Sequence, residues 1–216
     1  MLRSVDTYSR VMSFRIMPAT QPNQILALAG CRGVLRAREL DPLGIPRTVL
    51  SRLVEQGALV RVGRGLYARP DAEVTPHHSL VQVSARVPGG VVNLLSALAF
   101  HELTDELPAA VWIAVRTGRR APKQGSPRLE VTWTAPRFLE LGVRRHRIEG
   151  VDVAVTDPVR TVADCFKYRS RIGVNVAIAA LRDYVARFRG GRDALWEMAG
   201  ACRVQTVLRP YMEAMS

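Results

Sequence analysis

The sequence predicts an α+β protein made of two modules of unequal size. Three observations support this fold class. Residues 33–71 combine a helix–turn–helix pattern with a hairpin pattern. A polar segment with a proline at each end, Pro70 to Pro76, follows as a linker. Beyond it, short β-branched runs alternate with apolar helical stretches. We therefore divide the chain into residues 21–70 and 76–216, preceded by a leader at 1–20 that we expect to be poorly ordered.

The first module is expected to begin with a helix over Gln21 to Ala29. A short second helix over Arg36 to Leu40 should end in the turn Asp41 to Gly44, because proline interrupts a helix and glycine accommodates the turn. Pro46 then suits the first position of a third helix, where its missing N–H costs nothing.

A hairpin is expected directly after this third helix, which Gly57 ends. Strands at 58–62 and 66–69 should be joined by Gly63-Arg64-Gly65, because the glycines permit a tight turn and place one cation at its tip. Helix, turn, helix and hairpin in this order predict a winged helix-turn-helix, which is a DNA-binding module.

The third helix has two distinct faces. At about 100° per residue, Leu50, Leu53 and Val54 share the inner face, and short polar side chains and arginines share the outer one. Arginine, serine and threonine side chains at such positions reach base edges in the major groove. The predicted DNA contacts on the helix and the hairpin are Arg47, Thr48, Ser51, Arg52, Arg61 and Arg64.

A winged helix used for protein contacts, with solvated arginines, is the alternative for this module. Residues 32–69 contain eight arginines against three acids, and the arginines lie on the two elements that would face DNA. The formal charge of the whole chain is +12, from 31 basic and 19 acidic residues. These charges favour nucleic acid as the partner.

Composition also limits the class of protein. Hydrophobic residues make up 48% of the 216, enough to form a core. No apolar run reaches the roughly 20 residues needed to span a membrane. Cys31, Cys165 and Cys202 are odd in number and lack metal-ligand spacing. We expect a cytoplasmic protein without membrane contact, metal or cofactor.

The second module is predicted to be α+β, with a small, mostly antiparallel sheet and C-terminal helices. Its first helix should run from Pro76 to Val87, with Thr75 as the N-cap. The hairpin of the sheet should turn through Glu149-Gly150. The expected strands are 91–93, 111–115, 129–133, 143–148 and 151–155. The remaining expected helices are 94–103, 158–171, 174–188, 193–201 and 206–215.

Charged side chains recur along one face of the helix at 158–171, which begins at an Asp157 cap. They are Arg160, Asp164, Lys167 and Arg171. The simpler and preferred interpretation is a solvated face with ordinary ion pairs. The other is a partner-binding face, which Lys167 favours because lysine occurs only twice in the chain.

Two further groups of residues leave alternatives open. The segment 116–128 has five basic residues and no acid, so it is either a mobile arm along a phosphate backbone or a solvated hairpin loop. The histidines at 77, 78, 101 and 146 have no metal-ligand spacing, so surface or capping roles are expected.

Two stretches resemble the AbiEi family, the antitoxins and transcriptional regulators of type IV toxin–antitoxin (abortive infection) systems. They are GIPRTVLSRLVEQGALVRVGRGLYAR and VAVTDPVRTVADCFKYRSRIGVNVAIAALRDY, of which the second is more specific. The resemblance extends over nearly the whole chain from Gln21. It implies a repressor that binds inverted repeats in double-stranded operator DNA, and an antitoxin that neutralises a nucleotidyltransferase-like toxin.

The resemblance also implies roles for particular residues. It assigns DNA contact to the six residues predicted above and a candidate antitoxin face to Arg160, Asp164 and Lys167. An enzyme remains the alternative class. A phosphotransferase that modifies the toxin would need a lysine and metal-holding acids, which Lys167, Asp164 and Asp157 supply without a phosphate-binding loop. An endonuclease-like protein is disfavoured, since no D…ExK arrangement follows a strand.

Overall fold

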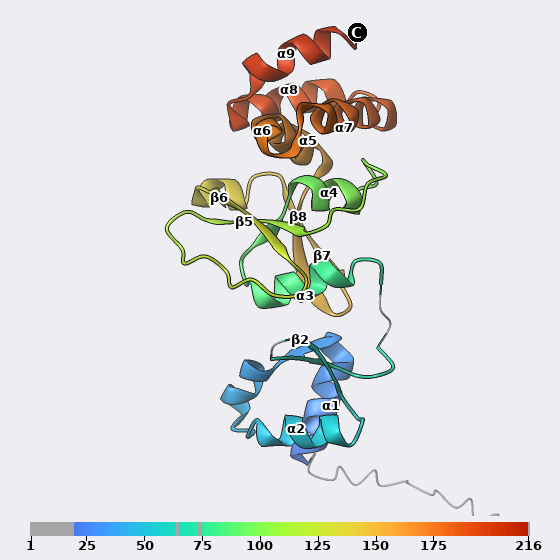
Figure 1. Cartoon of the computed structure of the whole chain (residues 1–216), viewed down its shortest axis with the longest axis vertical. Coiled ribbons are helices and arrows are strands. Elements are labelled where there is room, and N and C mark those ends of the chain that lie inside the picture. Colours follow the sequence, from blue (N-terminus) through green and yellow to red (C-terminus); the bar gives the residue numbers. More distant parts are fainter. Residues whose placement is uncertain (1–19, 64, 73–74, 216) are drawn as a thin grey trace, which may run out of the picture.

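The protein has an α+β fold, seen in a computed structural model that describes residues 20–63, 65–72 and 75–215. Figure 1 shows the N-terminal segment at one end, a sheet in the middle and the C-terminal helices at the other end. Apart from Thr20, the expected leader lies outside the described residues, and so does Arg64.

The N-terminal module contains three helical segments and one small sheet. Its elements are α1 (Gln21–Arg32), β1 (Val34–Arg36), the 3-10 helix η1 (Ala37–Leu43), α2 (Thr48–Glu55), β2 (Val60–Gly63) and β3 (Leu66–Ala68). The strands lie antiparallel in the order β1-β3-β2. The core between helices and sheet contains Ile25, Ala29, Leu35, Leu40, Ile45, Leu50, Leu53 and Leu59.

Several boundaries in this module differ from the expectation. Arg36 ends a strand instead of starting a helix, since β1 pairs with β3 and places Val34 opposite Ala68. The following segment is a 3-10 helix that continues through Pro42 and ends at Gly44, whose φ is 64°. α2 begins at Thr48 rather than Pro46, although the Pro46 carbonyl already accepts a hydrogen bond from the N–H of Val49.

The second module has a five-stranded sheet. Its elements up to the last strand are α3 (His78–Arg86), β4 (Val91–Val92), α4 (Leu94–Phe100), β5 (Val111–Arg116), β6 (Leu129–Thr134), the 3-10 helix η2 (Pro136–Leu139), β7 (Val143–Ile148) and β8 (Val151–Thr156). The hairpin through Glu149-Gly150 is confirmed, and both turn residues have positive φ. Thr75 is not the N-cap of α3, because His77 occupies that position.

The prediction of a mostly antiparallel sheet is wrong. The strand order is β6-β5-β4-β8-β7, and the pairs β4–β8 and β5–β6 are parallel, whereas β4–β5 and β7–β8 are antiparallel. The segment 117–128 is therefore a crossover between parallel strands rather than a hairpin loop. It is just long enough for such a crossover, which needs about a dozen residues.

Helices close the chain beyond the sheet (Figure 1). They are α5 (Pro158–Lys167), α6 (Arg169–Ile172), α7 (Val174–Arg187), α8 (Gly191–Cys202) and α9 (Gln205–Glu213). The single helix expected at 158–171 divides at Tyr168. α5 lies at the centre of this group and contacts α4, α7, α8 and α9, so most of its surface is covered.

The two modules meet along a closely packed junction. Val34 and Leu66 of the N-terminal sheet belong to the same buried cluster as Val81 and Val83 of α3. The backbones at Gly33 and Glu149 approach so closely that a Cβ at Gly33 would lie 1.6 Å from the Glu149 carbonyl oxygen. The division into residues 21–70 and 76–216 stays a prediction, and the two segments share apolar packing.

Candidate nucleic-acid interface

The outer face of α2 is open to solvent. Thr48, Ser51 and Arg52 are exposed, whereas Leu50 and Leu53 are buried in the module core. Within the described part of the chain, the side chain of Arg52 makes no hydrogen bond or ion pair. The structure therefore brings these three predicted residues together on one accessible face, and their contact with DNA remains a prediction.

Arg47 lies beside this face but is already paired. Its Nη2 lies 2.9 Å from Asp41 Oδ2 and 3.1 Å from Asp41 Oδ1. Both side chains are more than half exposed, and such surface ion pairs contribute only about 0–1 kcal/mol. The pair therefore holds Arg47 at the start of α2 without preventing it from reaching a stronger anion.

Of the two DNA contacts predicted on the hairpin, Arg61 lies within the described residues. Arg61 on β2 is exposed, and its Nε donates a hydrogen bond to the Gly63 carbonyl oxygen at 3.3 Å. This bond holds the guanidinium close to the turn. Arg64, predicted for the tip of the same turn, lies outside the described residues.

The charged residues of α5 do not form the solvated face that the sequence indicates. Arg160 and Asp164 are buried, with 3% and 2% of their surface exposed. Lys167 is half-buried and only Arg171 is exposed. The spacing places these residues on one side of the helix, but that side is also covered. The preferred interpretation, an exposed stripe of ordinary ion pairs, is wrong for the first two residues.

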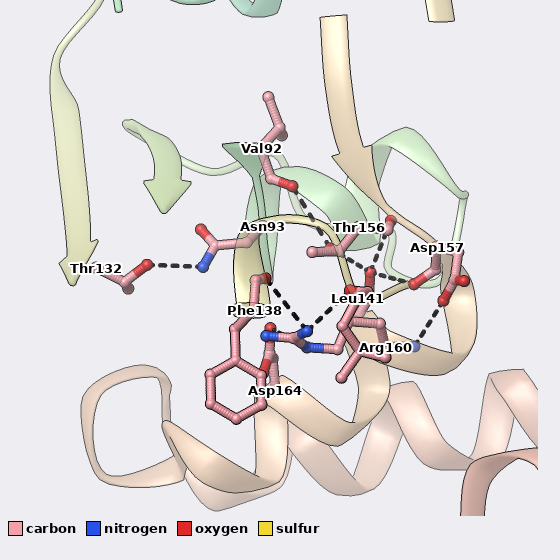
Figure 2. A network of polar contacts seen from close by, with 10 residues as sticks. Val92, Asn93, Thr132, Phe138, Leu141, Thr156, Asp157, Arg160 and Asp164 are labelled. Atoms are coloured by element: carbon pink, nitrogen blue, oxygen red, sulfur yellow. Dashed lines mark hydrogen bonds and ion pairs between the residues drawn. The ribbon is translucent and has the colours of Figure 1, made fainter. Parts of the chain in front are cut away.

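Arg160 and Asp164 form a buried ion pair within a polar network (Figure 2). Arg160 Nε lies 2.9 Å from Asp164 Oδ2, and Arg160 Nη1 donates to the Leu141 carbonyl oxygen at 2.9 Å. Asp164 Oδ1 has no hydrogen-bond partner in the described part of the structure. Burial raises the pKa of the Asp164 carboxyl group, and the charge of Arg160 only partly opposes this effect. The pair holds α5 against the segment around η2.

The other two residues of the predicted stripe point to different neighbours. The Lys167 ammonium lies 4.8 Å from the centre of the Phe138 ring, which gives a cation–π contact. Arg171 reaches the edge strand β6, where it pairs with Glu130 at 3.2 Å, and its guanidinium lies over the Trp112 ring. Lys167 and Arg171 are thus the members of the set that a partner can still reach.

Asp157 caps α5 as predicted, because its Oδ1 accepts a hydrogen bond from the Arg160 N–H at 2.8 Å. Asp157, Asp164 and Lys167 therefore all have structural contacts. None of them lines the three surface cavities described, which lie at the module junction and around residues 119–133. The enzyme alternative stays a prediction that these contacts do not support.

Two of the histidines occupy helix-cap positions, as expected: His77 precedes α3 and His101 follows α4. His77, His101 and His146 lie around the Phe100 ring, with ring centres 4.8–5.1 Å from it. Burial lowers the pKa of both His101 and His146. Among the described residues, no cluster of histidine, cysteine and acidic side chains could hold a metal ion.

Sequence reasoning missed a contact that fixes the start of the second module. Glu149 accepts hydrogen bonds from the Thr75 N–H and hydroxyl at 2.8 and 2.9 Å, and its Oε2 lies 2.6 Å from His78 Nδ1. Burial alone would raise the pKa of Glu149, but the hydrogen bonds from His78 and Thr75 together lower it. No local pattern indicates that a hairpin-turn residue would hold the distant linker.

Comparison with known protein families bears on the N-terminal module. Residues 23–70 match the model of a family described as "Transcriptional regulator, AbiEi antitoxin". The resemblance to the AbiEi family is confirmed. The matched segment runs from α1 to just past β3 and includes all six predicted DNA contacts. The second AbiEi-like stretch, 153–184, lies outside it.

Two further findings complete the comparison. No curated protein matches the chain. Within residues 20–63, 65–72 and 75–215, the helices are too short or too polar to cross a membrane.

Proposed function

We propose that this chain is an AbiEi antitoxin that also represses its own operon, as part of a type IV toxin–antitoxin system in the cytoplasm. The observation that carries the proposal is the AbiEi match, because it falls on the module whose helix α2 exposes Thr48, Ser51 and Arg52. The expected DNA partner is double-stranded operator DNA containing inverted repeats. The expected protein partner is a nucleotidyltransferase-like toxin.

The element order supports a winged helix-turn-helix in the N-terminal module. η1 and α2 are joined by a tight turn, and β2 and β3 follow as the hairpin of a three-stranded sheet. In such modules the second helix enters the major groove. The exposed side of α2 offers a guanidinium and two hydroxyl groups, which are the donors and acceptors that base edges require.

The antitoxin role is assigned to the second module, and it comes from the family resemblance. Of the residues first considered for this role, Arg160 and Asp164 are covered, so they would act by holding α5 in place. Lys167 and Arg171 are the residues of that set that we propose for toxin contact.

Titration of the full chain with a labelled duplex from upstream of its gene tests the proposal. Arg52→Ala should weaken operator binding by about 1–3 kcal/mol, which is about 5- to 150-fold, and reduce the preference over random DNA. Arg182→Ala, on the exposed side of α7, is the matched control with the same loss of charge and should bind as wild type does. A wild-type protein that binds operator and random duplex equally would refute sequence-specific regulation.

A further inference from the structure

A pocket of about 470 Å³ lies at the junction of the two modules. Its floor is the face of the N-terminal sheet that points away from the core of the first module, where Val34, Ala68 and Val60 lie side by side on β1, β3 and β2. α3 covers the neighbouring part of this face at Leu66 but leaves Val60 40% exposed. Pockets of about 300–1,000 Å³ with a mainly apolar lining and a few polar groups are typical sites for small molecules.

One wall of the pocket is the last turn of α1, and a glycine keeps it open. Gly30 lies within this helix, where glycine is less favourable than alanine because it loses more conformational freedom on folding. Packing does not require a glycine here, since a Cβ at Gly30 would meet only the Arg69 side chain, 3.8 Å from Nη1. Gly30 lines the pocket, so a larger side chain at this position would occupy its space.

The opposite wall contains a buried carboxylate that can accept a further hydrogen bond. The Glu149 side chain is only 6% exposed, and it lies at the end of the β7–β8 hairpin, beside the first module (Figure 1). A carboxylate can accept about four hydrogen bonds. Among the described residues, Glu149 has three such contacts, two with Thr75 at Oε1 and one with His78 at Oε2. A donor inside the pocket can therefore use the remaining position on Oε2.

The pocket is negatively charged, although the whole chain carries a formal charge of +12. Its described cation, Arg69, is paired with Asp71 at 2.9 Å, which leaves the charge of Glu149 in excess when histidine is counted as neutral. The C-terminal end of α1 adds the negative pole of the helix dipole. In the described part of the chain, the Gly33 N–H makes no capping hydrogen bond to this last turn, so its carbonyl groups remain available as acceptors.

We propose that this pocket binds a small organic ammonium ion, in which a protonated amine is attached to an apolar or aromatic body. The body packs on Val34, Val60 and Ala68, and the ammonium group donates to Glu149 Oε2 and to the carbonyl groups at the end of α1. Such a ligand contacts both modules at once. No residue of α2 lines the pocket, so the site does not depend on the proposed DNA binding.

Alkylation of Cys31 in the full chain measures whether the pocket is occupied. Cys31 lines the pocket and is exposed, whereas Cys165 and Cys202 are buried, so iodoacetamide should modify Cys31 first. The probe is tryptamine, and the matched control is indole-3-acetate, which has the same ring system and the opposite charge. Tryptamine at about 10 mM should slow the reaction at pH 7, since a ligand of this size is expected to bind with a Kd of about 1 mM. Indole-3-acetate should leave the rate unchanged.

Two variants place the effect in the pocket. Gly30→Leu suits a helix and fills the pocket, so tryptamine should no longer change the rate of Cys31 alkylation. Ala27→Leu is the control, because it adds the same side chain one turn earlier on α1, outside the pocket lining, and should keep the protection. Glu149→Gln, examined where circular dichroism shows that it is folded, should weaken tryptamine binding about 10-fold or more because the charged acceptor is lost.

The possible results separate the proposal from its alternatives. Protection by tryptamine that Ala27→Leu retains and Gly30→Leu loses would support the ammonium site. Equal protection by both probes, or stronger protection by indole-3-acetate, would overturn it, and the second result would assign the pocket to acids held by Arg69. Absence of protection by tryptamine, or protection that Gly30→Leu retains, would also overturn it. Operator binding enters none of these measurements, so their failure leaves the proposed function unaffected.

Discussion

Replacing Gly33 with alanine should destabilise the protein far more than the same change at Gly44. Both glycines have positive φ, of 68° and 64°, but their ψ angles differ, at −64° for Gly33 and 20° for Gly44. A Cβ at Gly33 would lie 1.6 Å from the Glu149 carbonyl oxygen, whereas a Cβ at Gly44 would meet nothing within 4 Å. The pair thus separates the cost of backbone conformation from the cost of forcing the two modules apart.

The expected magnitudes follow from the contacts at the junction. The left-handed α conformation costs an alanine about 1 kcal/mol at Gly44, and the rarer conformation of Gly33 costs it about 1–3 kcal/mol. At Gly33 the overlap with the Glu149 carbonyl group must also be relieved by moving the two modules apart. That movement strains the Gln82–Val62 and Arg36–Ser84 hydrogen bonds, worth about 1 kcal/mol each. The Gly33 variant should therefore lose about 3 kcal/mol or more, against about 1 kcal/mol for Gly44.

Urea unfolding followed by circular dichroism measures both losses. The free energy of unfolding in water should fall by the amounts above, with wild type as the reference. Equal losses in the two variants would refute the reasoning, because they would mean that the modules are not in contact at Gly33 in solution.

Two further predictions concern buried charges. Asp164→Ala should cost about 3–5 kcal/mol of stability because it leaves Arg160 buried without its partner. The double variant Arg160→Met/Asp164→Leu, which removes both charges, should cost much less. A loss below about 1 kcal/mol for Asp164→Ala in urea unfolding would contradict the buried pair. Glu149→Gln should destabilise the protein at pH 7, and this difference should shrink progressively as the pH falls below the ordinary carboxyl pKa of 4.5. The reason is that the pKa of Glu149 is lowered on folding, so its contribution is present above the unfolded pKa and lost as the pH falls through the folded one. Unfolding curves of both proteins between pH 3 and 7 measure this, and a difference that stays constant over this range would assign the effect to shape instead of charge.

Hydrophobic periodicity and turn residues predicted most elements of the fold. The hairpin at Glu149-Gly150 and the cap at Asp157 were found because their signals are local. β1 was missed because three residues show no period, and its strand character depends on pairing with β3, far along the chain. Whether β6 runs parallel or antiparallel to β5 depends on the path of the segment between them, and the composition of that segment is compatible with both arrangements.

The candidate sites likewise include features that the local sequence reveals and features that depend on tertiary packing. The outer face of α2 was predicted correctly as exposed. In a short surface helix, the apolar residues mark the buried side, and the opposite side therefore faces solvent. The charged residues of α5 were predicted as exposed because spacing reveals that residues share a face, but not what covers that face. The hydrogen bonds from Gln82 to the Val62 carbonyl oxygen and from Arg86 to the Pro127 carbonyl oxygen were not predicted, since these residues acquire their partners only when α3 lies between the hairpin and the crossover.

The apolar cluster shared by the two modules limits how such a protein could acquire a new target sequence. A fragment that starts at Pro76 would uncover the α3 surface that Val34 and Leu66 now protect, and a transplanted N-terminal module would uncover those two side chains. Exchange of the whole module between regulators would therefore require a matched α3. Substitutions at Thr48, Ser51 and Arg52 disturb no core contact, so the DNA specificity that we propose for these residues could diverge residue by residue on a fixed scaffold.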